Sequence, residues 1–236
     1  MLLKPHSPIM EFKFAWWMLA LSALVILLVG EFTQIDLIIE DFYYDSTLKI
    51  FPWKNAWFAK ILMHVYIKNL ILSCGFLLYL ILVIDLFKPM HIVNSWFRFR
   101  LRFVATASVV IPVTLSLLKK HSVLHCPWDI DRYNGNAPYL KLLDYVPKGL
   151  DAGACFPAGH ASTGLWLASL CVFWFPTNPT KVKQVFALGL LVGFILGWVQ
   201  QMRGAHFLFH TLWSIWIASF IILIICLLYT SPSPRD

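Results

Sequence analysis

The sequence predicts an all-α membrane protein, built as a bundle of six transmembrane helices. The chain of 236 residues is 59% hydrophobic and 13% charged, whereas ordinary soluble domains carry about 25% charged residues. Its mean hydropathy is +0.71. An apolar helix needs about 20 residues to cross a bilayer, and six stretches with at most one Asp, Glu, Lys or Arg come near that length: Phe14–Gly30, Asn69–Phe87, Phe103–Leu118, Ala158–Phe175, Gln184–Met202 and Phe207–Leu228.

The first of these stretches, Phe14–Gly30, follows Lys4 and Lys13 and in that respect resembles a signal peptide. A signal peptide ends in a small-residue cleavage site. No clean site of this kind follows Gly30, and five more apolar segments do. We therefore expect a retained first helix.

The positive charge predicts how the bundle is oriented. The formal net charge is +7, and Lys and Arg favour short cytoplasmic loops. We assign the N-terminus, Lys88–Arg102 and Thr177–Lys183 to the inside, and the longer segments Glu31–Lys68 and Lys119–Phe156 to the outside. Both termini are then cytoplasmic and the protein spans the inner, or plasma, membrane several times. The charge is explained by topology, so no nucleic-acid partner is expected.

One domain is expected to cover residues 1–225. The last residues, Cys226–Asp236, read "CLLYTSPSPRD", a string that resembles the translated read-through of a sequencing-library adapter. We interpret residues 226–236 as such an artefact or as a short disordered tail, and they take no part in the functional argument.

The five cysteines are not spaced as a zinc site, and we expect neither a metal nor another cofactor. Cys74, Cys171 and Cys226 fall in apolar runs, where cysteine usually packs as a small hydrophobic residue. Cys126 and Cys155 share one predicted outside loop. An oxidising compartment would permit a disulfide between them, and two reduced thiols are the alternative.

Three polar segments, far apart in the sequence, are predicted to meet at the outer end of the bundle: "KKHSVLHCPWD" (Lys119–Asp129), "PAGH" (Pro157–His160) and "RGAHFLFH" (Arg203–His210). The 45 residues between His160 and His206 are enough to cross the membrane twice. Cations and helix N-termini bind phosphate oxygens. A histidine can attack phosphorus while a second one protonates the leaving group. These segments therefore point to metal-free phosphoryl transfer.

The order and spacing of these segments resemble the type-2 phosphatidic acid phosphatase superfamily of membrane phosphatases. Its first motif, Lys, six residues, then Arg-Pro, is met by Lys119 and Pro127, with Cys126 in place of Arg. Its second, Pro-Ser-Gly-His, has Ala158 in place of Ser. Its third, Ser-Arg, five residues, His, three residues, Asp, is met at His206, with departures at the other positions: Val199, Gln200 and His210.

The resemblance implies an enzyme that hydrolyses a phosphomonoester or pyrophosphate of a membrane lipid through a phosphohistidine. In that mechanism His206 is the nucleophile and His160 the acid and base, with His210 standing where the orienting Asp is usual. The remaining roles would fall to nearby polar groups. The phosphate would be held by Lys119 and Arg203, helped by Lys120 and the amide of Gly159, and Asp129 or Asp131 would supply the missing carboxylate from the loop.

Other readings remain open at this point. A membrane protein that kept the fold but lost activity would bind anionic lipid head groups, and the departures at Cys126, Ala158, Gln200 and His210 suit that reading. Paired intramembrane histidines can also ligate haem, but these lie at helix ends beside cations. His210 is nearly as well explained by packing against Trp213 or Trp128, and lysines at a helix end can simply anchor it at the interface. The oligomeric state and the lipid stay undetermined.

Overall fold

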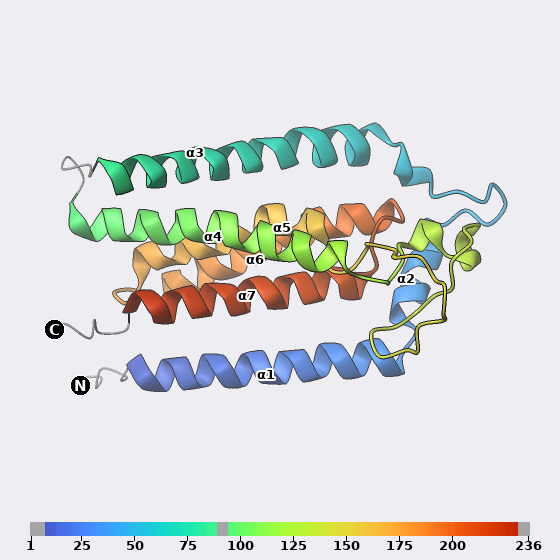
Figure 1. Ribbon diagram of the computed structural model, residues 1–236, viewed down its shortest axis with the longest axis horizontal. Helices are drawn as coiled ribbons and strands as arrows, with labels where there is room; N and C mark the ends of the chain where they lie inside the picture. Colours follow the sequence, from blue (N-terminus) through green and yellow to red (C-terminus); the bar gives the residue numbers. More distant parts are fainter. Residues whose placement is uncertain (1–7, 89–93, 231–236) are drawn as a thin grey trace.

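The computed structural model describes residues 8–88 and 94–230. Its helices run along the long axis, and turns and short helices gather at one end (Figure 1). Within the described residues there are two isolated β-bridges and no strand. The all-α class expected from the sequence is therefore confirmed.

Within the described residues, five helices are long and apolar enough to cross a membrane, in agreement with five of the six expected spans. They are α1 (Pro8–Phe32), α3 (Lys68–Phe87), α4 (Ser95–Lys120), α6 (Pro179–Met202) and α7 (Leu208–Thr230). The expected tail also differs in part, because Cys226–Thr230 continues α7; residues 231–236 lie outside the described residues.

The sixth expected span, Ala158–Phe175, forms a shorter and tighter helix. It consists of α5 (Gly159–Leu165), with seven residues, and the 3₁₀ helix η5 (Trp166–Trp174), with nine. A 3₁₀ helix rises about 2.0 Å per residue against about 1.5 Å in an α-helix. The sixteen residues therefore extend for about 28 Å, close to the ~30 Å hydrocarbon core. Because it has only sixteen helical residues, this segment is not among the candidate spans, although its length is close to the thickness of the core.

A glycine face on α6 lets α5 and η5 pack closely against it. Gly189 and Gly193 are four residues apart, as small residues are where membrane helices approach closely. A Cβ at Gly189 would lie 2.2 Å from the backbone nitrogen of Ala168, and one at Gly193 would lie 2.3 Å from the Leu165 side chain. This contact fixes the start of α5 relative to the end of α6, where the candidate site lies.

The remaining long helices surround this pair. The main core lies between α4, α5, η5 and α7, and α1 and α3 pack on the outside of the bundle, α1 on α7 and α3 on α4 (Figure 1). Both outer helices expose large apolar side chains, among them Trp17, Leu21, Phe76 and Leu77. Such faces suit contact with lipid.

The expected outside segment Glu31–Lys68 is more ordered than a polar loop. It contains α2 (Ile35–Tyr43), the short η1 (Pro52–Lys54) and the π-helix η2 (Phe58–Ile67), which runs directly into α3. The other outside segment contains η3 (Pro127–Asp129) and η4 (Asp131–Tyr133). Both segments lie at the same end of the bundle, on the right in Figure 1, where their aromatic residues share a second core cluster.

Candidate functional site

The turn between α6 and α7 places His206. The Gly204 N–H donates to the Gln201 carbonyl at 2.8 Å and the Ala205 N–H to the Gln200 carbonyl at 2.9 Å, the pattern of a Schellman helix end. Gly204 has a φ of +74°, and a Cβ there would lie 2.5 Å from the Phe51 ring. Only glycine fits both conditions, so helix α6 ends at Met202, four residues before His206.

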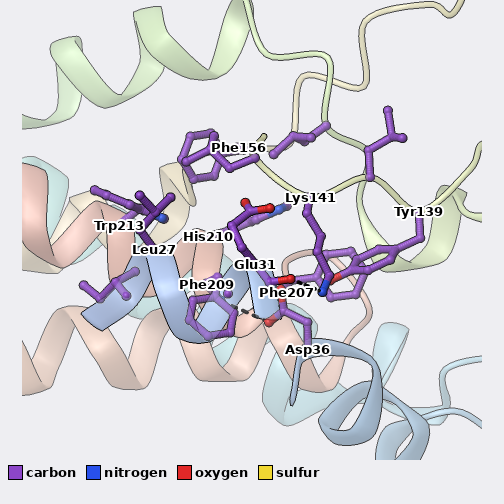
Figure 2. Close-up of a pocket in the computed structure, with 15 residues that line it drawn as sticks. Leu27, Glu31, Asp36, Tyr139, Lys141, Phe156, Phe207, Phe209, His210 and Trp213 are labelled. Atoms are coloured by element: carbon purple, nitrogen blue, oxygen red, sulfur yellow. Dashed lines mark hydrogen bonds between the residues drawn. The ribbon is translucent and has the colours of Figure 1, made fainter. Parts of the chain in front are cut away.

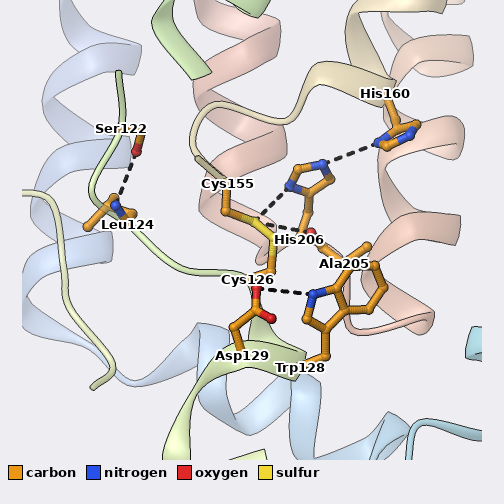
Figure 3. The surroundings of a disulfide bond; sticks show 9 residues. All are labelled: Ser122, Leu124, Cys126, Trp128, Asp129, Cys155, His160, Ala205 and His206. Atoms are coloured by element: carbon orange, nitrogen blue, oxygen red, sulfur yellow. Dashed lines mark hydrogen bonds between the residues drawn. A yellow bond between two sulfur atoms is a disulfide. The ribbon is translucent and has the colours of Figure 1, made fainter. Parts of the chain in front are cut away.

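His206 lies between His160 and Cys155. Its Nε2 is 3.4 Å from Nδ1 of His160, and its Nδ1 is 3.4 Å from Sγ of Cys155; Figure 3 shows the ring between these two partners. The residue is 1% exposed. Burial, and then the nearby charges of His160, His210 and Lys119, hold the pKa of His206 well below its ordinary value. A neutral ring with a free lone pair on one nitrogen is therefore available.

His160 and Lys119 come from two helix ends. His160 is the second residue of α5, directly after Gly159. A Cβ on Gly159 would lie 3.4 Å from Cδ of Lys119, in the last turn of α4. The Lys119 charge acts on His160, His206 and His210. Its neighbour Lys120 is exposed, so the structure brings only the first of the two lysines to the histidines.

Arg203 reaches the same region from the end of α6. It is 7% exposed, its Nε donates to the Lys54 carbonyl at 3.2 Å and its Nη1 to Oε1 of Gln200 at 2.7 Å. Its charge acts on His160. Gln200, which stands where the family usually has Arg, thus holds the arginine found three residues later.

His210 lies beside His206 without a described hydrogen bond between the two rings. Their centroids are 5.9 Å apart in an edge-on arrangement, and the His210 ring also packs against Phe156 and Phe207. Its Nδ1 is buried and has no hydrogen-bond partner. The structure therefore places His210 next to the nucleophile position but not at the orienting contact, which Cys155 occupies.

Asp129 is not brought to the histidines. Its carboxylate accepts a hydrogen bond from the Trp128 indole at 3.1 Å (Figure 3). The Trp128 N–H donates to the Gly204 carbonyl at 3.0 Å. This bond fixes η3, and the Asp129 side chain turns toward the indole.

Cys126 and Cys155 form a disulfide, with an S–S distance of 1.98 Å and Cα atoms 5.3 Å apart. The chain before Cys155 also pairs with the segment after α4: Ala154 N–H donates to Ser122 and Cys155 N–H to Leu124. The two sulfurs and a His206 ring nitrogen lie within 4.8 Å of one another. Metals bind the thiolate form, which a disulfide does not offer.

His64 is a site residue that the sequence analysis missed. It lies on η2, and its ring centroid is 4.6 Å from that of His160. The sequence analysis placed His64 in an outside segment. In the structure η2 continues directly into α3, and this continuous helix brings His64 to the start of α5. A histidine within the apolar run "KILMHVYIK" was the signal available.

Asp36, on α2, was also missed. It is 6% exposed, accepts the Phe209 N–H at 3.1 Å and so caps the start of α7 (Figure 2). It lines a cavity of about 30 Å³ together with His210 and Lys141. Burial raises the pKa of Asp36 from 3.8 to about 7, against the opposing backbone hydrogen bonds from Phe209 and Leu208 and the charge of Lys141.

This raised pKa couples folding to pH. Between about pH 4 and pH 7 the folded chain keeps the Asp36 proton, whereas the unfolded chain releases it. The contribution of this group therefore falls as pH rises through that window, by about 1.4 kcal/mol per pH unit and roughly 4 kcal/mol in all.

The fold and this site define a class of protein: a membrane-embedded helical bundle with a histidine pair, His206 buried and His160 partly buried, beside cations that have no carboxylate partner among the described residues. The family model described as PAP2 superfamily matches residues 100–233, more than half of the chain, and the chain belongs to that superfamily. Members are generally phosphatases. The match begins within α4, so it does not include His64 or Asp36. Searches of curated proteins and of solved structures found no match.

Proposed function

We propose that this protein is a metal-independent phosphatase of a membrane lipid, acting on a phosphomonoester or pyrophosphate through a phosphohistidine. The observation that carries the proposal is the 3.4 Å approach of His160 Nδ1 to His206 Nε2 beside Lys119. A nucleophile and a proton carrier within hydrogen-bond reach are what such a reaction requires. Lys119 and Arg203 would attract phosphate oxygens and repel a divalent cation.

The reaction has two steps. His160 takes up a proton when the phosphate anion binds beside it. His206 Nε2 then attacks phosphorus, the N–P bond forms, the P–O bond to the lipid breaks, and the His160 imidazolium gives that proton to the leaving oxygen. His160 then takes a proton from water, whose oxygen attacks phosphorus as the N–P bond breaks and inorganic phosphate leaves. Reacting atoms must lie about 3–3.5 Å apart before attack. The His160 ring therefore shifts aside from His206 when the phosphate enters.

Cys155 takes the place of the usual orienting carboxylate. A proton on Nδ1 leaves Nε2 of His206 free to attack, and that Nδ1 lies 3.4 Å from Sγ of Cys155, whose backbone carbonyl is a polar neighbour of both His206 and His210. A carbonyl fixes the tautomer as a carboxylate would. It carries no full negative charge, so it stabilises the charged intermediate less.

The proposed location is the inner (plasma) membrane, with the site on the outer, periplasmic face and both chain ends inside. The disulfide supports this assignment because such bonds persist in oxidising compartments. The first turns of α4 and α6 at the opposite end carry Arg98, Arg102, Lys181 and Lys183, which supports a cytoplasmic position for that end. The partners are then the bilayer and a phosphorylated lipid.

The test is phosphate release from a panel of phosphorylated lipids by the purified protein in detergent with EDTA present. Wild type is compared with His206→Ala, His160→Ala and the control His121→Ala, which changes an exposed loop histidine. We expect release that survives EDTA, is lost in the first two variants and is kept in the control. A ³²P-labelled substrate should also label His160→Ala or wild type at a base-stable, acid-labile bond, and never His206→Ala.

One observation favours a second candidate, a protein that binds anionic lipid heads without turning them over: no carboxylate among the described residues contacts the His206 ring. Folded wild type that binds the lipids but neither releases phosphate nor forms a phosphoenzyme would support this candidate and refute the phosphatase.

A further inference from the structure

A second group of cationic and imidazole side chains lies beside His160. His64 stacks on His160 with ring centroids 4.6 Å apart, and its Nδ1 is buried without a hydrogen-bond partner. Lys68 follows one helical turn later, at the start of α3. Both residues precede the segment that the PAP2 family model matches, so the family motifs give them no role.

The positive charges divide into two sets around His160. The charge of Lys119 acts on His160, His206 and His210, whereas those of Lys68 and Arg203 act on His64 and His160. Lys119, the single member of the first set, therefore lies near His206. The second lies beside the residue that protonates the leaving group.

None of these cations has a carboxylate partner in the part of the chain that the structure describes. The ion pairs there involve Asp85 and Asp41, and neither contacts Lys68, Lys119 or Arg203. Arg203 uses Nε and Nη1 for hydrogen bonds, which leaves its Nη2 without a partner among the described residues. Partly buried charges are costly unless they are paired. The arrangement thus calls for an anion on the leaving-group side as well.

We infer that His64 and Lys68, with Arg203 shared between them and the reacting phosphate, form a second oxyanion subsite, which holds a phosphate in the leaving group of the substrate. The inference rests on the proposed phosphatase function and narrows its substrate class to lipid diphosphates. His206 attacks the terminal phosphorus, the bond to the bridging oxygen breaks, and the lipid monophosphate leaves with its negative charge between Lys68 and Arg203. Water then releases the terminal phosphate from His206.

The subsite makes a prediction about selectivity. A hydrogen bond to a charged group contributes enough for roughly a tenfold to hundredfold change in affinity. Lys68→Met should therefore lower kcat/KM for a polyprenyl diphosphate by about that factor. The same variant should leave kcat/KM for the matching polyprenyl monophosphate within about twofold. Lys68→Arg, which keeps the charge, should restore most of the loss. His64→Phe keeps a ring on His160 but removes Nδ1, so it should lower the ratio of kcat/KM for the diphosphate to kcat/KM for the monophosphate, as Lys68→Met does.

The experiment measures phosphate release from the two lipids, which share one polyprenyl chain, by the full-length protein in detergent. The matched control is Lys60→Met, because Lys60 lies on η2, which continues into the helix that holds Lys68, but is exposed and donates a hydrogen bond to Asn55. Size-exclusion profile and unfolding midpoint show whether each variant is folded. An equal loss on both lipids, or no loss on the diphosphate, would overturn the subsite and leave Lys68 as an anchor at the membrane interface.

A binding measurement separates this inference from the proposed function. Methylenediphosphonate, which cannot be hydrolysed, should raise the unfolding midpoint of wild type more than inorganic phosphate does. Lys68→Met should abolish that difference, and Lys60→Met should keep it. If wild type releases no phosphate from either lipid, the proposed function fails, and the diphosphonate result still decides the subsite. Equal stabilisation by the two anions would refute it.

Discussion

Removing the disulfide should impair both folding and catalysis, because Cys155 holds the His206 ring. The perturbation is the double variant Cys126→Ser/Cys155→Ser, compared with the control Cys74→Ser, which changes a free, exposed cysteine. The native bond is buried, with Cys155 at 0% and Cys126 at 7% exposure. Replacement is therefore a cleaner change than a reductant, which reaches the bond only when the loop opens.

The size of the effect on stability follows from the loop that the bond closes. The two cysteines are 29 residues apart, and cross-linking a loop of that length removes about 3–4 kcal/mol of unfolded-chain entropy at 25 °C. The effect on catalysis follows from geometry. A displacement of about 1 Å at a reacting group can reduce the rate about a hundredfold, so we expect kcat to fall about tenfold to a hundredfold and KM to change less.

The assay combines chemical unfolding in detergent with phosphate release from the best substrate in the lipid panel. The wild-type bond is verified first by thiol labelling before and after reduction. An unfolding free energy and a kcat equal to those of Cys74→Ser would refute the reasoning. Lost stability with unchanged kcat would show that the bond supports the outer loop but does not position His206.

Two further variants test Asp36, which caps the start of α7, and Gly204, which forms the turn between α6 and α7. The unfolding midpoint of wild type should fall from pH 5 to pH 7.5, and this fall should be smaller in Asp36→Asn, which lacks the carboxyl with the raised pKa. Thermal unfolding at matched ionic strength measures both. Identical pH slopes in the two proteins would contradict the role given to the buried acid. Gly204→Ala places a side chain at a left-handed φ of +74° and against the Phe51 ring, so it should lower the unfolding free energy by about 2 kcal/mol or more. Gly149→Ala is the control, because Gly149 has a φ of +83° but open space around it. That variant should lose only the free energy that comes from the left-handed backbone.

The sequence was sufficient for the parts of the fold that depend on local composition. Long runs without charge must be helical in a bilayer because each backbone group needs an internal partner, and five such runs match long helices. The sixth run, Ala158–Phe175, is helical as expected but is not among the five long helices, because its 3₁₀ winding and its packing on the glycine face of α6 depend on how closely two helices approach. The sequence analysis also did not predict that η2 continues directly into α3, because the composition of this segment gives no clear sign of one continuous helix.

For the candidate site, the order of motifs named His160, His206, Lys119 and Arg203, because residue type and spacing carry that information. The close approach of His160 to His206, the contact of Cys155 with the ring and the distance of Asp129 from it were decided by tertiary structure. So was the arrival of His64 from a segment outside the family match. The sequence determines which chemical groups are present, whereas contact between residues 46 to 96 positions apart depends on how all the helices pack together.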